Sequence, residues 1–162
     1  YVGPIPVHII FILIVIIITA IILTRTSFGR SIYAVGGNKM AAQYSGIDAK
    51  KVILLVFIIN GILAGCAGIL SSSRTMVGQY SLGDGAEMDA ITAVVLGGTS
   101  MTGGVGTIGG TVIGCIIVGV LNNGMNLLGI DSSWQYVVQG AVVLLAVGVD
   151  FLKKSGMLQK RK

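Results

Sequence analysis

Three asparagines, Asn122, Asn123 and Asn126, stand late in an uncharged apolar run that extends from Thr107 to Leu128. Asn122 and Asn126 are four residues apart, so they would share one face of a helix. An amide buried in such a run must find a hydrogen-bonding partner or water. The pattern allows two interpretations. The amides line a polar path for a hydroxylated solute, or they form hydrogen bonds between helices.

Two glycine motifs suggest nucleotide chemistry, but neither has the required context. The segment Gly104-Val-Gly-Thr-Ile-Gly109 matches the dinucleotide-binding spacing, yet no strand precedes it and no βαβ unit surrounds it. The segment 98–103 begins like a phosphate-binding loop, but Gly104 and Val105 follow where lysine and serine or threonine are needed. We therefore expect no bound cofactor and no ATP hydrolysis by this chain itself.

The remaining reactive side chains form no catalytic or metal-binding pattern. His8 is the only histidine and stands at the end of an apolar run, and Cys66 and Cys115 lie inside such runs. Six acidic residues are scattered near the ends of the runs. Ion-coupled transporters usually place ionisable groups inside the membrane. The sequence therefore predicts no catalytic residue and no metal site. The lack of an ionisable residue in the middle of a run also argues against proton coupling.

The composition indicates that these residues sit in a bilayer. The chain has 162 residues, of which 54% are hydrophobic and only 10% are charged. A soluble domain carries about 25% charged residues. So few charges could not cover a water-exposed surface, which makes lipid the expected solvent.

Four apolar runs are long enough, or nearly so, to cross a membrane, since a spanning helix needs roughly 20 residues. Two basic stretches, 25–51 and 153–162, each hold five of the eleven lysines and arginines. Positively charged loops face the cytoplasm, so an even number of crossings must separate these stretches. We expect spans at about 7–24, 52–70, 107–128 and 134–152, with a short or broken span at 88–99.

That short span would continue into the glycine-rich stretch from Gly97 to Gly110. Non-helical backbone at membrane depth is tolerated only where protein or a water-filled cavity surrounds it. The expected arrangement has five crossings, with the N-terminus outside and the C-terminus in the cytoplasm.

The basic stretch 25–51 contains a candidate docking element. Lys39 to Tyr44 suits a short helix, and Gly46 can end it in the left-handed conformation. A short helix that protrudes between two spans can dock into a groove of a partner. The alternative is a loop helix that lies on the lipid headgroups.

Longer blocks of sequence carry a resemblance to a known family. The blocks are 87–106, 110–114 and 121–129, together with Gly29-Arg-Ser-Ile-Tyr-Ala-Val-Gly-Gly-Asn38 upstream. From about Thr24 to Lys154 the chain closely resembles the ribose-type permease subunit of bacterial ATP-binding-cassette sugar importers.

The resemblance implies an all-α membrane protein, a helical bundle of the type II importer permease kind, in the bacterial cytoplasmic membrane. It implies a second permease subunit, two ATP-binding cassette ATPase subunits, an extracytoplasmic sugar-binding protein and a monosaccharide substrate. Full permeases of this kind are about twice as long, as ten spans of about 20 residues plus loops require. The chain would then be the C-terminal part of one.

The candidate site residues fall into two sets. The family's ATPase-docking loop corresponds to Ala41, Ala42, Gly46 and Ile47, and we extend this coupling loop to Gly37 and Asn38. The candidate translocation path comprises Asn122, Asn123, Asn126, Gly97, Gly98 and Thr99.

Two other functions stay open at this point. A secondary transporter or facilitator for a small polar solute could also place a glycine-broken helix near its substrate. A membrane scaffold without a solute path is the third possibility. The sequence does not identify the sugar.

Overall fold

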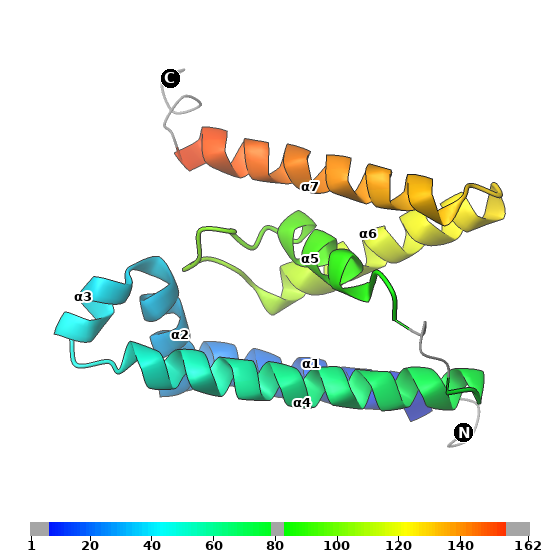
Figure 1. Ribbon diagram of the computed structural model, residues 1–162. Helices are drawn as coiled ribbons and strands as arrows, with labels where there is room; N and C mark the ends of the chain where they lie inside the picture. The colour runs from blue at the N-terminus through cyan, green and yellow to red at the C-terminus, as the bar shows by residue number, and fades with distance from the viewer. Residues whose placement is uncertain (1–6, 79–82, 155–162) are drawn as a thin grey trace. The chain divides into compact units, whose positions relative to one another are not determined.

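The computed structural model describes residues 7–78 and 83–154, and every regular element in these ranges is a helix. The all-α fold predicted from the sequence is confirmed. The chain forms two compact units, 1–83 and 84–162, and each is described by itself. The first unit contains α1 (Val7–Arg25), α2 (Ser27–Gly37), α3 (Lys39–Tyr44) and α4 (Ala49–Thr75) (Figure 1). The second contains α5 (Ala86–Leu96), α6 (Ile108–Leu127) and α7 (Ser132–Lys154).

Three of the helices are long and apolar enough to cross a membrane, namely His8–Arg25, Ala49–Thr75 and Ile108–Leu127. A shorter apolar stretch, Ser132–Gly148, forms most of α7. Large apolar side chains on α1 and α4 are exposed, among them Ile12, Leu54 and Phe57. Such surfaces need lipid or other apolar helices around them. These features fit the multi-pass membrane protein predicted from the sequence.

Several helices differ in length from the expected spans. α4 begins at Ala49 and continues to Thr75, so Arg74 is helical and does not lie in a loop. The short helix expected at 88–99 is present as α5, from Ala86 to Leu96. The expected cytoplasmic tail 153–162 lies almost entirely outside the described residues.

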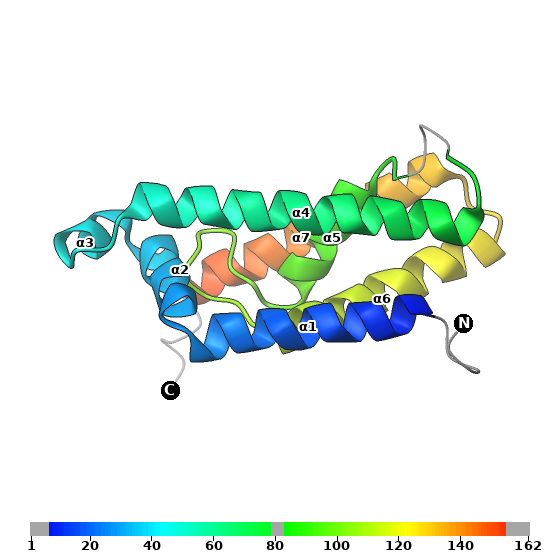
Figure 2. The ribbon, with the colours of Figure 1, turned by 90° about the horizontal axis from the view of Figure 1, so that it is seen from below.

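The first unit contains a helix that the sequence analysis did not anticipate. α2 begins directly after α1, and the Thr26 hydroxyl caps it by accepting a hydrogen bond from the Gly29 backbone N–H at 3.1 Å. Gly29 is buried against the carbonyl oxygens of Ile22 and Leu23, where a Cβ would not fit. The chain can therefore reverse sharply between α1 and α2. Figure 2 shows α1 and α4 lying apart and joined at one end through α2 and α3.

In the second unit, glycines allow α5 and α6 to touch through their backbones. A Cβ on Gly114 would collide with the Ala93 carbonyl oxygen, and Gly97 and Gly110 would collide with each other's backbone in the same way. Small residues permit this close approach in lipid, where apolar surface alone does not drive helices together. These glycines therefore form a close packing contact between α5 and α6.

Between α5 and α6 the backbone is irregular. The α5 helix ends at Leu96, and Gly98 just beyond it has a φ of +84°. The backbone N–H groups of Gly98 and Thr99 donate to the carbonyls of Val95 and Val94, each at about 3 Å, as in a Schellman motif. Ser100 is buried and its backbone N–H donates to the Val105 carbonyl at 2.9 Å. These bonds satisfy polar backbone groups that lipid could not.

Candidate functional site

The candidate coupling segment is built around α3, whose bounds match the sequence prediction. The Asn38 side chain caps the helix by accepting a hydrogen bond from the Ala41 N–H at 3.0 Å. At the other end Gly46 has a φ of +83°, so the predicted left-handed residue is confirmed. The N–H groups of Gly46 and Ile47 donate to the carbonyls of Gln43 and Ala42, both at 3.0 Å. Both ends of this short helix are therefore fixed by hydrogen bonds.

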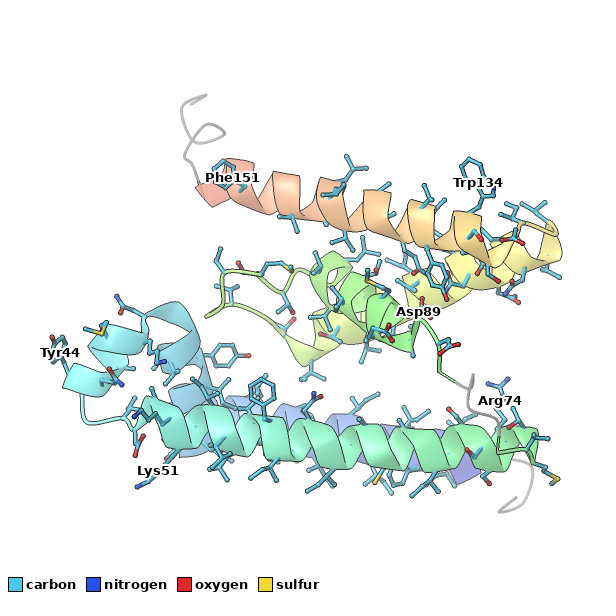
Figure 3. The ribbon with its side chains drawn as sticks, in the orientation of Figure 1. Tyr44, Lys51, Arg74, Asp89, Trp134 and Phe151 are labelled. Atoms are coloured by element: carbon cyan, nitrogen blue, oxygen red, sulfur yellow. The ribbon has the colours of Figure 1, made fainter. Side chains whose placement is uncertain are left out.

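The coupling segment has one buried side and one exposed side. Ala42 and Ala49 are buried within the first unit, and Ile47 is half-buried. Gly37, Asn38 and Ala41 are exposed. Two large side chains of α3 are exposed, Met40 at 60% and Tyr44 at 85%. Figure 3 labels Tyr44 on α3. An exposed methionine and tyrosine on a rigid helix are the side chains that a partner's groove could bury.

Asp48 links the coupling segment to α4. Its carboxylate caps α4 by accepting hydrogen bonds from the N–H groups of Lys50 at 3.1 Å and Lys51 at 3.2 Å. The Lys51 backbone N–H is the main reason that the pKa of Asp48 lies below its usual value. A lowered pKa means that the cap stabilises the helix above the carboxyl's unfolded pKa. This stabilisation disappears as the pH falls through the pKa that Asp48 has in the folded protein.

The second candidate site is a polar cluster that joins all three helices of the second unit. Asp89 of α5 accepts hydrogen bonds from Asn122 of α6 at 2.9 Å and from Gln139 of α7 at 2.6 Å, both through Oδ1. Gln139 Nε2 also donates to Asn122 Oδ1 at 3.0 Å. Gln139 is only 4% exposed, and its Oε1 has no hydrogen-bonding partner in the described part of the chain. Figure 3 labels Asp89 on α5.

A second pair of amide side chains joins α6 to α7. Asn126 of α6 accepts a hydrogen bond from Gln135 Nε2 of α7 at 2.7 Å, and Gln135 also donates to the Ile130 carbonyl at 3.3 Å. Asn123 is exposed and takes no part. Two of the three candidate asparagines, Asn122 and Asn126, thus form hydrogen bonds between helices.

Asp89, Gln135 and Gln139 were not predicted as site residues. Asp89 was counted among the acids near the ends of the apolar runs. One signal was available. Gln135 and Gln139 are four residues apart, as are Asn122 and Asn126, and the two pairs flank the turn that follows α6. In a helical hairpin such mirrored spacing places each glutamine opposite one asparagine.

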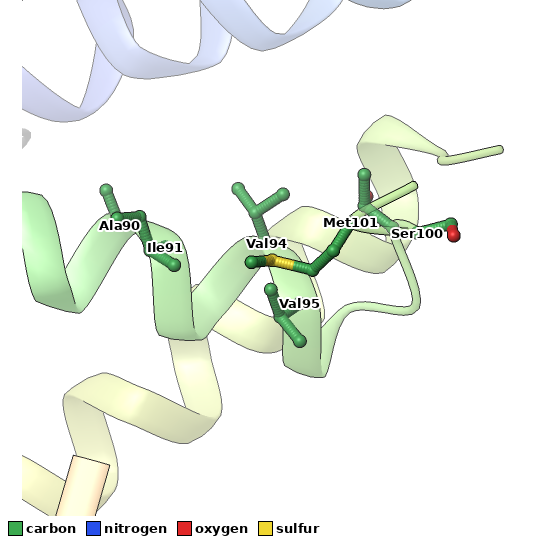
Figure 4. A pocket seen from close by; sticks show the side chains of 7 residues that line it. Ala90, Ile91, Val94, Val95, Ser100 and Met101 are labelled. Atoms are coloured by element: carbon green, nitrogen blue, oxygen red, sulfur yellow. The ribbon is translucent and has the colours of Figure 1, made fainter. Parts of the chain in front are cut away.

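The three path residues predicted in the glycine stretch, Gly97, Gly98 and Thr99, have different places in the structure. Gly97 packs on the backbone of α6, and Gly98 ends α5 in the left-handed conformation. Thr99 lines a largely apolar cavity of about 280 Å³, together with Ser100 and residues of α5 (Figure 4). The structure gives Gly97 and Gly98 a clear part in folding, and only Thr99 borders a cavity.

A second cavity lies beside the polar cluster. It has a volume of about 220 Å³, and Asp89 and Asn122 form its polar side. Its other lining residues are small or apolar: Ala90, Ala93, Cys115, Val118 and Gly119.

The chain is similar to sugar permeases over most of its length. A family model described as branched-chain amino acid transport system / permease component matches residues 2–147. The xylose transport system permease protein of Escherichia coli (strain K12) is 50% identical over 131 residues, which are 81% of this chain and 33% of that protein.

Two ribose import permease proteins are similarly related. That of Bacillus subtilis (strain 168) is 46% identical over 155 residues, which are 96% of this chain and 48% of that protein. That of Escherichia coli (strain K12) is 51% identical over 132 residues, 82% of this chain and 41% of that protein. The chain thus spans between a third and half of these relatives' length. No solved structure matches it.

Proposed function

Because the chain belongs to the family described as branched-chain amino acid transport system / permease component, we propose that it is part of the permease subunit of an ATP-driven importer for a monosaccharide such as ribose. The supporting observation is its 46–51% identity to relatives named as ribose and xylose permeases. The second unit would contribute to the translocation path. ATP would be hydrolysed on partner ATPase subunits, and a binding protein would deliver the sugar from outside.

The exposed side of α3 supports a coupling role for the segment 37–47. Its two ends are held by capping hydrogen bonds, so Met40 and Tyr44 are presented in fixed directions. A helix-in-groove contact relies on a few such anchors. ATP binding to the partner would move this helix and, through α4, the bundle.

Uptake into vesicles tests the proposed function. The full-length permease would be reconstituted with its ATPase and binding protein, and labelled ribose and xylose would be supplied outside. We expect uptake only when ATP is present on the ATPase side. Uptake by the permease alone, without ATPase or ATP, would instead support a facilitator or secondary transporter. If neither sugar crosses the membrane, the result would support a membrane scaffold without a solute path.

The proposed orientation predicts which positions an impermeant thiol reagent can reach. Single cysteines at Lys39 and Ser132 of a cysteine-free full-length permease should label from the inside and from the outside, respectively. The reason is that basic loops stay in the cytoplasm. Lys154 should behave like Lys39. Gln79, which lies outside the described residues, should behave like Ser132. External labelling at position 39 would reverse the orientation.

The asparagine path predicts a transport defect in Asn126→Leu. A hydroxylated solute would lose a hydrogen-bonding partner in a desolvated channel, at roughly 1–3 kcal/mol, so uptake should fall about ten-fold or more. Copurification with the ATPase should be unchanged.

Gln135→Leu provides the matched control, because it removes the same 2.7 Å hydrogen bond from the other helix. If Asn126 meets the solute, only Asn126→Leu should reduce uptake strongly. Equal defects in the two variants, or normal uptake in Asn126→Leu, would show that the pair serves helix packing alone.

A further inference from the structure

The carboxylate of Asp89 occupies an unusual position for a helical membrane protein. It lies in the first turn of α5 and bonds to residues well inside α6 and α7. An ionisable side chain among membrane helices is costly and generally marks a substrate or ion pathway. The one ion pair found in the described residues joins Lys51 to Asp48, so Asp89 has no cationic partner there. Two neutral amides are its hydrogen-bond donors.

The hydrogen bonds of Asp89 leave part of the carboxylate available. Both amide donors bind Oδ1, and no described residue donates to Oδ2. A carboxylate has about four acceptor positions. Asp89 also borders the 220 Å³ cavity, so a ligand there can reach the carboxyl group without displacing the amides.

The cavity has the chemistry that a sugar ring needs. A carboxylate and an amide, Asp89 and Asn122, stand on one side and can bind adjacent hydroxyls as acceptor and as donor. The rest of the lining is small or apolar, with Ala93 and Val118 themselves buried, and Gly119 adds no side chain to the space. The volume equals that of about seven liquid waters at roughly 30 Å³ each, which suits one monosaccharide ring and not two.

The cluster also contains a buried oxygen, Gln139 Oε1, that accepts no hydrogen bond from the described residues. Leaving such an acceptor unbonded is costly. The hydrogen bonds of this cluster are therefore incomplete as they stand.

We propose that Asp89 and Asn122 form a hydroxyl-binding subsite for a pentose on the translocation path, in the cavity between α5 and α6. The subsite rests on the proposed function, since it assumes a sugar as cargo. Sugar hydroxyls donate to the free side of the Asp89 carboxylate, and the Asn122 amide bonds a neighbouring hydroxyl. Asp89 is thus a residue that contacts the substrate, and Gln139 positions it.

Cys115 lines the same cavity and is exposed, so its thiol can report occupancy directly. The experiment uses full-length permease in vesicles in which Cys115 is the sole cysteine. Alkylation by a small maleimide is followed with and without ribose or xylose. We expect either pentose to slow the reaction, and the disaccharide sucrose to leave it unchanged. A matched protein that keeps only Cys66, which lies in the other unit, should show no protection.

Asp89→Asn separates the charge from the geometry, because an asparagine Oδ1 can still accept both amide bonds. Loss of charge-assisted bonds to hydroxyls should raise the half-protecting pentose concentration by about ten-fold or more. A purely structural role for Asp89 would leave that concentration unchanged, so an unchanged value would overturn the proposal.

The wild-type protection measurement does not depend on any variant at position 89 folding. Pentose uptake without any protection of Cys115 would overturn the subsite and leave the proposed importer function intact. Absence of both uptake and protection would instead count against the importer function, and the subsite would fall with it.

Discussion

Replacing Gly114 with valine is expected to prevent the second unit from packing and to abolish transport. Even a single Cβ at this buried position would overlap the Ala93 carbonyl oxygen, and that atom belongs to the backbone of α5. Overpacking a tight contact costs about 1–3 kcal/mol, and more when no flexible side chain can move aside. The free energy of unfolding should therefore fall by about 3 kcal/mol or more. Thermal unfolding of the purified full-length permease in detergent measures the change.

A matched pair of alanine variants on the same helix makes the test specific. Gly114→Ala introduces the same collision in its smallest form. Gly109→Ala places a Cβ where no described atom lies within 4 Å. Gly109 lies in the first turn of α6, where the preference for alanine over glycine is smaller than the roughly 1 kcal/mol of a helix interior, so Gly109→Ala should be close to neutral. If both variants unfold at the same temperature, the close contact between α5 and α6 is not what holds this unit together.

Replacing Gly46 with valine is expected to abolish ATP-driven sugar uptake while the permease still inserts. Gly46 has a φ of +83°, which a β-branched residue adopts at a cost of about 1–2 kcal/mol. The strain would disturb the Schellman hydrogen bonds of Gly46 and Ile47 and change the direction in which α3 presents its exposed side chains. Uptake and substrate-stimulated ATP hydrolysis should both fall in vesicles that contain ATPase and binding protein.

Asparagine is the matched control at this position, because it tolerates the left-handed conformation. Gly46→Asn should retain most of the coupling, and Gly46→Val should not, although a Cβ at this position meets no neighbouring described atom within 4 Å. Both proteins should be present in the membrane at normal amounts. Normal coupling in Gly46→Val would remove the reason for assigning the segment 37–47 to ATPase coupling.

Local signals in the sequence determined the helices and some of their ends. A long apolar run can be predicted as a helix from its own residues, because the thickness of the bilayer sets the length that a spanning helix needs. The α3 helix and its terminal Gly46 followed from capping preferences that act over a few residues. The short α5 helix followed from charge placement and the need for an even number of crossings. Only α2 was not predicted, because its glycines and serines are weak helix formers.

The place of Asp89 in the polar cluster was decided by tertiary structure. Asp89 meets Asn122 and Gln139 across 33 and 50 residues of sequence, and no local rule links it to those positions. The mirrored spacing of the asparagines and glutamines pairs them with one another, but it does not show that Asn122 and Gln139 both bind a carboxylate. Which polar groups meet depends on how closely the helices approach. That distance is set by backbone contacts at Gly97, Gly110 and Gly114, where the absence of a side chain lets α5 and α6 touch.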